Sequence, residues 1–287
     1  MINYFLKQKI KKINSLTPSY EDIQKSNKIL FSIFTRYGDT IIALQVIKEL
    51  IEQYPTKEYL IFCPKQMQPY AKELLPHVEC LALNKRNILD LIKSVRIIKK
   101  REFDIGFNPW SNGLDSCFLI SYCNKFLFYK DFDRPKVINH YQVVRRYLKL
   151  DEKDWVVSEL ELKESYNKIL ICPQSTDIDR AISGDALDKL IIDLQEMYNH
   201  PRITIASIDK SFFRDDCFKF KFEKTKQSSE KFIDLIKKNA LVVCSDSGPL
   251  HIALALKKDI LAIMRTTLPD IVINTESRLN IKNINNR

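Results

Sequence analysis

Hydrophobic residues along this chain fall into short apolar runs, and most runs are followed by a segment in which apolar positions recur every three or four residues. Short runs are typical of buried strands, and the longer spacing is typical of amphipathic helices. The predicted strands begin at Lys28 and then cover residues 59–64, 78–83, 103–109, 168–173, 202–207, 240–244 and 259–264. The predicted helices cover residues 40–54, 67–75, 88–100, 114–121, 140–150, 184–198 and 228–238, with a last one after Pro249. This alternation predicts an α/β fold of parallel sheets with helices on both faces.

A polar, charged stretch at residues 151–167 divides the predicted elements into two similar halves. We therefore predict a basic amphipathic N-terminal extension at residues 1–27, a first Rossmann-like domain at 28–155, and a second one with a C-terminal tail at 156–287. Two such halves joined by a linker imply a cleft between them. The Asn-rich tail after Asp270 carries little apolar signal.

The formal net charge of +10 over 287 residues favours an anionic partner, such as a nucleotide, a nucleic acid or a negatively charged membrane surface. Many lysines lie scattered through amphipathic segments, and the chain has no RNA-binding signature and no arginine block. We therefore expect no nucleic-acid partner.

The seven cysteines are widely spaced and lie mostly in apolar runs without a CxxC pair, which indicates reduced core residues in a cytosolic protein rather than a zinc site. Asp-x-Asp triplets at residues 131–133 and 177–179 suggest a Mg²⁺ or Mn²⁺ site for a nucleotide sugar. Such triplets are common in a chain this charged, and the second one is followed by Arg180, which already supplies a cation for a phosphate. We therefore expect no metal. The chain also lacks the GxGxxG and Walker A sequences of Rossmann oxidoreductases and P-loop NTPases.

No apolar run approaches the roughly 20 residues that a membrane-spanning helix needs, and the N-terminus has no signal-peptide core. The first segment has an apolar helical face that suits either a membrane surface or the protein's own surface, although Lys9 interrupts it. This face consists of Ile2, Leu6, Ile10 and Ile13, with Lys7 and Lys11 opposite. Membrane contact and packing on the protein's own surface therefore both stay open.

Residues 239–258, NALVVCSDSGPLHIALALKK, predict a buried strand, a sharp turn and a helix. The turn carries Asp246, Ser247 and Gly248, and His251 follows on the first turn of the helix. Free N–H groups at such a helix start face the carboxyl end of the strand, where open α/β sheets bind phosphates. In the alternative interpretation, Asp246 or Ser247 only caps the helix and His251 is a polar residue of its first turn.

The first predicted strand ends in Arg36-Tyr37-Gly38-Asp39-Thr40, so Asp39 lies at a helix start on the sheet edge that faces the predicted cleft. A carboxylate there is able to take a proton from an acceptor hydroxyl, and such general-base help is typically worth ~10²–10⁴ in rate. The alternative is that Asp39 is the helix N-cap, a position that aspartate favours. Arg36 and Gly38 belong to the same acceptor-side turn.

The first strand of the second half is followed by Ser175, Thr176 and, a few residues later, Arg180. A guanidinium and hydroxyl groups at the end of a strand are suited to hold a diphosphate and to stabilise charge on a leaving phosphate, which can replace a metal ion. The alternative is that these are only the polar residues that are common in loops.

Five segments occur in an order that resembles a known family: RYGDTIIALQVIKELIEQYP, FDIGFNPW, HYQVVRRYLKL, ICPQST…DR and VVCSDSGPLHIALAL. From about Lys28 to Asp270 the chain resembles the glycosyltransferase family 9 heptosyltransferases of lipopolysaccharide synthesis. The resemblance implies a GT-B fold with two Rossmann-like domains facing a cleft. It also implies inverting, metal-independent transfer from ADP-heptose to a lipid-linked, anionic inner-core acceptor. The enzyme would then be cytoplasmic, with peripheral contact at the inner membrane as a further expectation.

The resemblance assigns roles to the same residues. Asp39 matches the proposed catalytic base of the family, in an acceptor-side first domain. The matching donor-side residues of the second domain are Ser175, Thr176 and Arg180 in the phosphate loop, Asp246 for sugar hydroxyls, Ser247 and Gly248 for the diphosphate, and His251 without an assigned role.

The chain departs from the family around the predicted donor site. Arg180 stands where the family usually has lysine, Ala181-Ile182-Ser183 stands where a Trp-Pro pair is common, and residues 265–269 replace a Gly-Pro-Thr-Asp-Pro segment. Two alternatives therefore stay open: an enzyme that uses another nucleotide sugar for a different surface glycan, and a catalytically silent relative that binds nucleotide or membrane.

Overall fold

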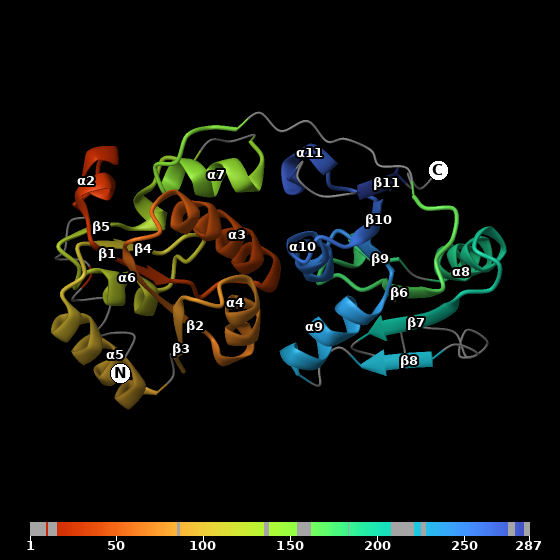
Figure 1. Cartoon of the computed structure of the whole chain (residues 1–287), viewed down its shortest axis with the longest axis horizontal. Helices are drawn as coiled ribbons and strands as arrows, with labels where there is room; N and C mark the ends of the chain where they lie inside the picture. The colour runs from red at the N-terminus through yellow and green to blue at the C-terminus, as the bar shows by residue number, and fades with distance from the viewer. Residues whose placement is uncertain are drawn as a thin grey trace. The chain divides into compact units, whose positions relative to one another are not determined.

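The computed structural model describes residues 10, 16–84, 87–134, 138–153, 162–182, 184–207, 221–224, 228–274 and 279–283. The chain divides into two compact units, residues 1–153 and residues 154–287. Each unit is built on one parallel sheet with helices packed against it (Figure 1). The predicted α/β class, with strands and helices alternating along the chain, is confirmed.

The sheet of the first unit has five strands in the order β3-β2-β1-β4-β5, all parallel. They are β1 (Lys28–Ser32), β2 (Glu58–Cys63), β3 (Glu79–Ala82), β4 (Ile105–Phe107) and β5 (Lys125–Leu127). The chain first adds strands on one side of β1 and then returns to the other side with β4. This order is that of a Rossmann-type sheet, with the reversal between β1 and β4.

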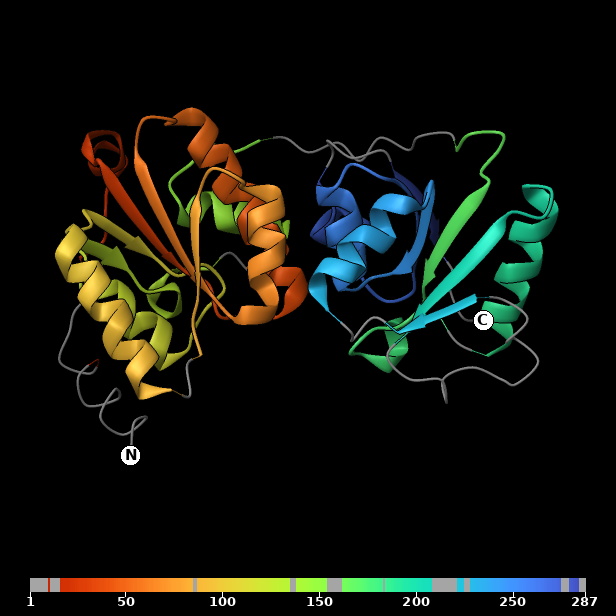
Figure 2. The ribbon, with the colours of Figure 1, turned by 60° about the horizontal axis from the view of Figure 1, so that its bottom comes forward.

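Helices cover both faces of this sheet. In Figure 2 the sheet separates α3 and α4 from α5 and α6. The helical segments of the unit are α2 (Tyr20–Lys25), α3 (Tyr37–Gln53), the short η1 (Lys65–Met67), α4 (Gln68–Leu74), α5 (Ile88–Arg101), α6 (Leu114–Ile120), the short η2 (Tyr129–Asp131) and α7 (His140–Tyr147). The α5–α6 face encloses a hydrophobic core around Leu30, Phe62 and Phe103, each 1% exposed or less.

The N-terminal extension contributes one described residue to this core. Ile10 is 4% exposed and packs in the same cluster as Leu30 and Phe103. Of the two interpretations of the apolar N-terminal face, this contact favours packing on the protein's own unit, since a side chain held in the core is not offered to a membrane. Residues 1–9 and 11–15, which carry the rest of that face, lie outside the described residues.

The sheet of the second unit has six parallel strands in the order β11-β10-β9-β6-β7-β8. They are β6 (Lys168–Cys172), β7 (Arg202–Ser207), β8 (Lys221–Lys224), β9 (Leu241–Ser245), β10 (Asp259–Met264) and β11 (Leu279–Asn283). The helical segments are the short η3 (Ile178–Arg180), α8 (Asp185–Met197), α9 (Ser229–Lys238), α10 (Gly248–Ala255) and α11 (Pro269–Val272). This is the complete Rossmann order, with the reversal between β6 and β9.

Three strands were not predicted, and all lie at the edges of the sheets: β5, β8 and β11. β5 has only three residues, while β8 (KFEK) and β11 (LNIKN) alternate apolar and polar residues instead of forming a continuous apolar run. A central strand is covered on both faces and is apolar throughout, whereas an edge strand needs only a few apolar positions. The expectation of little apolar signal after Asp270 therefore missed β11, whose Leu279 is 1% exposed.

The six cysteines in the described part of the chain are buried and make no disulfide, as predicted; Cys217 lies outside it. Burial raises the pKa of the Cys172 and Cys244 thiols, which keeps them protonated and unreactive. Among the described residues, we find no helix whose length and apolar character would let it cross a membrane.

Candidate functional site

The reversal of strand order marks where each sheet is expected to bind ligands. Open α/β sheets bind at the carboxyl ends of the two strands between which the order reverses, because the connections there leave in opposite directions. In the first unit these strands are β1 and β4, and Asp39 follows β1. In the second unit they are β6 and β9, which are followed by Ser175 and Asp246. The predicted site residues therefore occupy the reversal point of their own sheet.

Asp39 is part of helix α3 and does not cap it. The helix begins at Tyr37, with Arg36 at the N-cap position and no side-chain cap, so Gly38 and Asp39 are its second and third residues. The prediction that the helix starts at Thr40 is wrong because the Gly-Asp pair forms the first helical turn rather than a separate turn. The Thr35 hydroxyl donates a hydrogen bond to Asp39 Oδ2 at 3.3 Å.

The surroundings of Asp39 make its carboxylate a stronger base than an ordinary aspartate. Partial burial raises the pKa of Asp39, and His140, the Thr35 hydrogen bond, Arg36 and Arg134 only partly oppose this effect. Three cationic or titratable side chains therefore lie within electrostatic reach of one carboxylate. His140 and Arg134 were not predicted as site residues, and they come from segments about a hundred residues away from Asp39 in sequence.

Trp110, in the loop after β4, is the centre of an aromatic cluster beside Asp39. The Trp110 ring lies 5.2 Å from the Tyr129 ring and 5.1 Å from the His140 ring, between centroids, and the Arg134 guanidinium lies 4.6 Å from the Trp110 ring centre. Trp110 also has a backbone φ of 59°, in the left-handed region that bulky residues rarely adopt. None of these aromatic residues was predicted as part of a site.

Buried hydrogen bonds fix this loop in place. Asn108 is fully buried, its Oδ1 accepts from the Tyr129 backbone N–H and the Tyr147 hydroxyl, both at 2.9 Å, and its Nδ2 donates to the Ser111 carbonyl at 2.6 Å. The Ser111 hydroxyl in turn accepts from the Phe34 N–H at 2.7 Å. The loops after β1 and β4 are thus joined directly, which holds the Trp110 loop at the β1–β4 reversal point.

In the second unit, the loop after β6 reaches the loop after β9. The Ser175 hydroxyl donates to the Asp246 backbone carbonyl at 3.3 Å, and Arg180 Nη1 lies 3.1 Å from Asp246 Oδ2. The same arginine places its Nε 3.4 Å from Asp177 Oδ2, so it bridges two carboxylates. Asp246 is 4% exposed and Arg180 is 40% exposed, which leaves the guanidinium accessible. Thr176 is exposed on the same loop.

The turn after β9 presents a helix N-terminus without a side-chain cap. Ser247 occupies the N-cap position of α10, but its hydroxyl donates to the Ser245 carbonyl at 3.2 Å instead of accepting from the helix. Gly248 and Pro249 are the first two residues of the helix, which therefore begins two residues before its predicted start. His251 is buried on the first turn. The alternative in which Asp246 or Ser247 caps the helix by its side chain is therefore wrong, and backbone N–H groups of this turn stay available to a ligand.

Arg265 connects the end of β10 to the loop that carries Arg180. Its Nη1 donates to the Ala181 carbonyl at 2.6 Å, and the next backbone N–H, that of Ile182, donates to the Pro173 carbonyl at 2.8 Å. Ala181 and Ile182 are buried, whereas Ser183 lies outside the described residues. Two of the three departures from the family pattern, at residues 181–183 and 265–269, thus meet in one contact.

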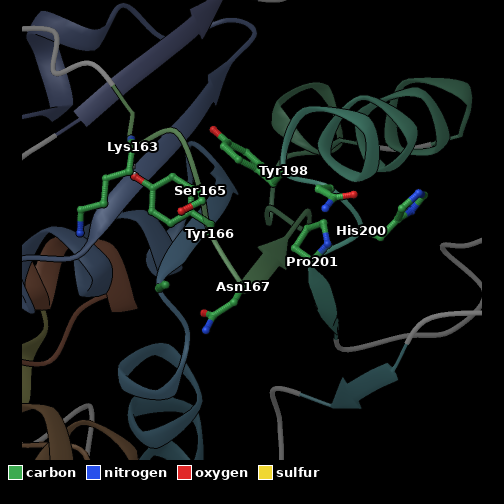
Figure 3. A pocket seen from close by; sticks show the side chains of 9 residues that line it. Lys163, Ser165, Tyr166, Asn167, Tyr198, His200 and Pro201 are labelled. Carbon is green, nitrogen blue, oxygen red and sulfur yellow. Dashed lines mark hydrogen bonds between the residues drawn. The ribbon is translucent and has the colours of Figure 1, made fainter.

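A separate hollow of about 490 Å³ lies at the other end of the second sheet (Figure 3). Its lining includes Asn167, Pro201 and Ala240, which immediately precede β6, β7 and β9, so the hollow lies at the amino ends of these strands. Tyr166 and Lys163 line it and contact Asp259 Oδ2 at 3.1 and 3.2 Å. The hollow contains none of the predicted site residues.

Neither Asp-x-Asp triplet belongs to a metal-binding group in the part of the chain that the structure describes. No cluster of three or more His, Cys, Asp or Glu side chains is placed there to hold an ion. Asp177 instead accepts from the Asp179 backbone N–H at 3.1 Å and contacts Arg180. This carboxylate stabilises the short helix η3.

Comparison by sequence gives a match to one family and none to curated proteins. Residues 225–283 match the family model of glycosyltransferase family 9 (heptosyltransferase). This segment contains β9, α10 and β10, and so includes Asp246, Ser247, Gly248 and His251. No curated protein matches the chain.

Comparison by structure gives similar folds over most of the chain. The Escherichia coli ADP-heptose LPS heptosyltransferase II matches with a TM-score of 0.65 at 16% identity, over 88% of this chain and 89% of that one. A glycosyltransferase family 9 protein from Veillonella parvula DSM 2008 matches with a TM-score of 0.68 at 11% identity, over 89% and 85%. The E. coli heptosyltransferase WaaC with ADP matches with a TM-score of 0.62 at 11% identity, over 88% and 93%.

At these identities the structural matches establish the fold, and the sequence match covers the part of the second unit from just before α9 to the end of β11. The predicted GT-B fold class is confirmed by similarity to the heptosyltransferase structures. The chain is thus similar in sequence to glycosyltransferase family 9 (heptosyltransferase) over residues 225–283, and similar in fold to heptosyltransferase structures over most of its length.

Proposed function

We propose that this protein is an inverting, metal-independent glycosyltransferase that moves heptose from ADP-heptose to a lipopolysaccharide inner-core acceptor. The family match and the shared fold support a glycosyltransferase. One observation carries the assignment to these residues: Asp39 follows the strand at the reversal point of the first sheet, and Ser175 and Asp246 follow the corresponding strands of the second. A base on one unit and an anion site on the other are the two parts that transfer from a nucleotide sugar requires.

In the proposed reaction, Asp39 removes the proton from an acceptor hydroxyl while that oxygen attacks the anomeric carbon of the donor. The bond between the anomeric carbon and the diphosphate oxygen breaks at the same time, and the electron pair leaves on ADP. A single displacement of this kind inverts the anomeric configuration. The raised pKa of Asp39 supports the role of base, because a more basic carboxylate accepts the hydroxyl proton more readily. Arg36 and Gly38 form the helix start that holds this carboxylate.

The leaving diphosphate is the proposed ligand of the second unit. The accessible guanidinium of Arg180, the hydroxyl groups of Ser175 and Thr176 and the uncapped turn at Ser247 and Gly248 are donors that suit phosphate oxygens. Asp246 is the proposed partner of sugar hydroxyls, and His251 supports the turn from its buried position in α10. Because Arg180 contacts Asp246, binding of the diphosphate would share or replace this ion pair.

The choice of ADP-heptose rests on relatives, since WaaC from E. coli has been solved with ADP. A different nucleotide sugar, used for another surface glycan, is the second candidate. The contact between Arg265 and Ala181 favours it, because both residues belong to segments in which the family pattern is replaced. An anionic, lipid-linked acceptor suits the net charge of +10, and we propose that transfer takes place at the cytoplasmic face of the inner membrane.

A thermal-shift series with ADP, ADP-heptose, UDP-sugars and GDP-sugars tests the donor assignment. A ligand at 100 times its dissociation constant stabilises the folded state by about 2.7 kcal/mol, which raises the melting temperature by several degrees. We expect ADP and ADP-heptose to give the largest shifts. A larger shift with a UDP- or GDP-sugar would support the second candidate, and no shift with any nucleotide would exclude both enzyme assignments.

Transfer assays with Asp39→Ala test the base. We expect this variant to lose transfer while it keeps the thermal shift with ADP-heptose, since Asp39 lies in the other unit from the donor residues. An undiminished transfer rate would remove Asp39 from the mechanism.

A further inference from the structure

Two buried hydrogen-bond donors beside Asp39 have no partner among the described residues. These are the indole N–H of Trp110 and the hydroxyl of Tyr129. Burial raises the pKa of the Tyr129 hydroxyl, so this group stays protonated at neutral pH and acts as a donor. Buried polar groups are nearly always paired, and a pair of unpaired donors in contacting rings calls for an acceptor that the described residues do not supply.

The charges around these donors identify the kind of acceptor. The guanidinium of Arg134 lies 4.6 Å from the centre of the Trp110 ring and is exposed, and the His140 ring lies 5.1 Å from the Trp110 ring, between centroids. Arg134 and His140 also act electrostatically on Asp39, which puts them within reach of the proposed base. Two neutral donors with a cation above them favour an oxyanion over a neutral hydroxyl or a cation.

The position of Trp110 is held by the fold rather than by the ring contacts alone. The hydrogen bonds of Asn108 to Ser111 and Tyr129 connect the Trp110 loop to the segment that carries the Tyr129 hydroxyl. The positive φ of Trp110 shows that the backbone tolerates an unfavourable conformation to place this side chain. Residues held in sparsely populated backbone conformations cluster at catalytic and ligand-binding sites.

We propose that Trp110, Tyr129 and Arg134 form an oxyanion subsite that determines acceptor specificity: the indole N–H and the phenol donate to a phosphate or carboxylate group of the acceptor, and Arg134 balances its charge. This inference rests on the proposed function, because it makes the subsite part of acceptor binding next to Asp39. An acceptor sugar anchored by its anionic group would present a neighbouring hydroxyl to the carboxylate. A neutral acceptor would leave both donors unpaired, so the subsite discriminates against it.

The two tryptophans of the chain make a direct test possible. The full-length protein, labelled with ¹⁵N-tryptophan, gives one indole N–H resonance for Trp110 and one for Trp155, and Trp110→Phe assigns them. Inorganic phosphate and acetate are titrated separately at constant ionic strength, with chloride as the control anion. We expect a saturable downfield shift of the Trp110 resonance with phosphate or acetate, and the stronger of the two identifies the group as phosphate or carboxylate. A Trp110 resonance that does not respond, or responds to chloride in the same way, would overturn the proposal.

Variants test whether the three residues act together. Tyr129→Phe and Arg134→Gln should each weaken the binding of the anion by about tenfold or more, because each removes a hydrogen bond or a charge to an ionised group. Tyr122→Phe is the matched control, since it removes a tyrosine hydroxyl from the same unit just before the amino end of β5. Equal anion affinity in Tyr129→Phe and Tyr122→Phe would exclude Tyr129 from the subsite.

Failure of this inference is distinguishable from failure of the proposed function. If ADP-heptose stabilises the protein but the Trp110 resonance does not respond to anions, only the subsite is excluded. If the resonance responds but no nucleotide sugar stabilises the protein, the anion site stands and the glycosyltransferase assignment does not.

Discussion

Removal of the Arg180 guanidinium should weaken both the second unit and its affinity for ADP. Asp246 is 4% exposed, and Arg180 Nη1 lies 3.1 Å from its Oδ2. Breaking a fully buried ion pair by removing one partner costs about 3–5 kcal/mol. Because Arg180 is 40% exposed, water screens the charge and can partly replace the guanidinium, so the loss is smaller. We expect Arg180→Ala to lower the free energy of unfolding of this unit by about 1–3 kcal/mol.

The same substitution removes the proposed cation of the diphosphate. A hydrogen bond to a charged group contributes about 1.5–3 kcal/mol, so the dissociation constant for ADP should rise by roughly 10–150-fold. Arg180→Lys keeps the charge but cannot contact Asp177 and Asp246 through two separate nitrogens, and should show an intermediate loss. Isothermal titration with ADP measures the affinity, and urea denaturation, followed for the transition that ADP shifts, measures stability.

Two comparisons make this prediction refutable. Arg202→Ala, which removes an exposed arginine at the amino end of β7, should change neither quantity. In a double-mutant cycle, Arg180→Ala and Asp246→Asn should show a coupling of about 1 kcal/mol, because each removes the same contact. If Arg180→Ala matches Arg202→Ala in ADP affinity and stability, or if the two changes are additive, the argument from the ion pair is wrong.

Three further predictions test other contacts. Because the pKa of Asp39 is raised by burial, its contribution to stability is present below the ordinary aspartate pKa of ~3.9 and is lost as pH rises through the folded value. In thermal melts, Asp39→Asn should therefore be more stable than the wild type at pH 7 and no more stable at pH 3. A variant that is less stable than the wild type at pH 7 would contradict the burial effect. Arg265→Ala should lower the free energy of unfolding by about 1–2 kcal/mol and weaken the binding of ADP several-fold, as measured by calorimetry, because the Ala181 loop loses its contact with the end of β10. Unchanged ADP affinity would show that Arg265 does not contribute to the donor site. Leu279→Ala should cost about 2–4 kcal/mol in urea denaturation, and a negligible cost would contradict the pairing of β11 with β10.

The central strands of both sheets were predictable because they are covered on two faces. Residues such as Ile29 to Phe31 and Val242 to Cys244 are fully buried, and a strand of this kind is apolar at every position. β8 and β11 escaped prediction because an edge strand alternates with polar residues and resembles a loop in sequence. The Rossmann strand order follows from the structure alone, since periodicity does not say on which side of β1 the chain adds β4.

The parts of the candidate site that lie within one segment of the sequence were predictable. The parts that form only where separate segments meet in the folded protein were not. Asp39, Ser175 and Asp246 follow apolar strands directly, so their place at a sheet edge can be derived from local pattern. Trp110 lies in the loop after β4 and Tyr129 begins the short helix η2, and their contact depends on the Asn108 hydrogen bonds that form only in the folded unit. The sequence did place Trp110 just after a predicted strand. This position indicates a site residue only once β4 is known to lie beside β1.

The capping interpretations of Asp39 and Asp246 were both wrong, and for related reasons. Aspartate and serine are favoured at N-caps, so a strand followed by such a residue and a helix suggests a cap from sequence alone. In α3 the helix begins before Asp39, and in α10 the Ser247 hydroxyl donates to a carbonyl outside the helix. A carboxylate that satisfied a helix end would be held by backbone N–H groups and would be a weaker base. Because neither carboxylate is used in this way, Asp39 keeps its raised pKa and Asp246 remains directed at Arg180, where a diphosphate and its sugar would bind.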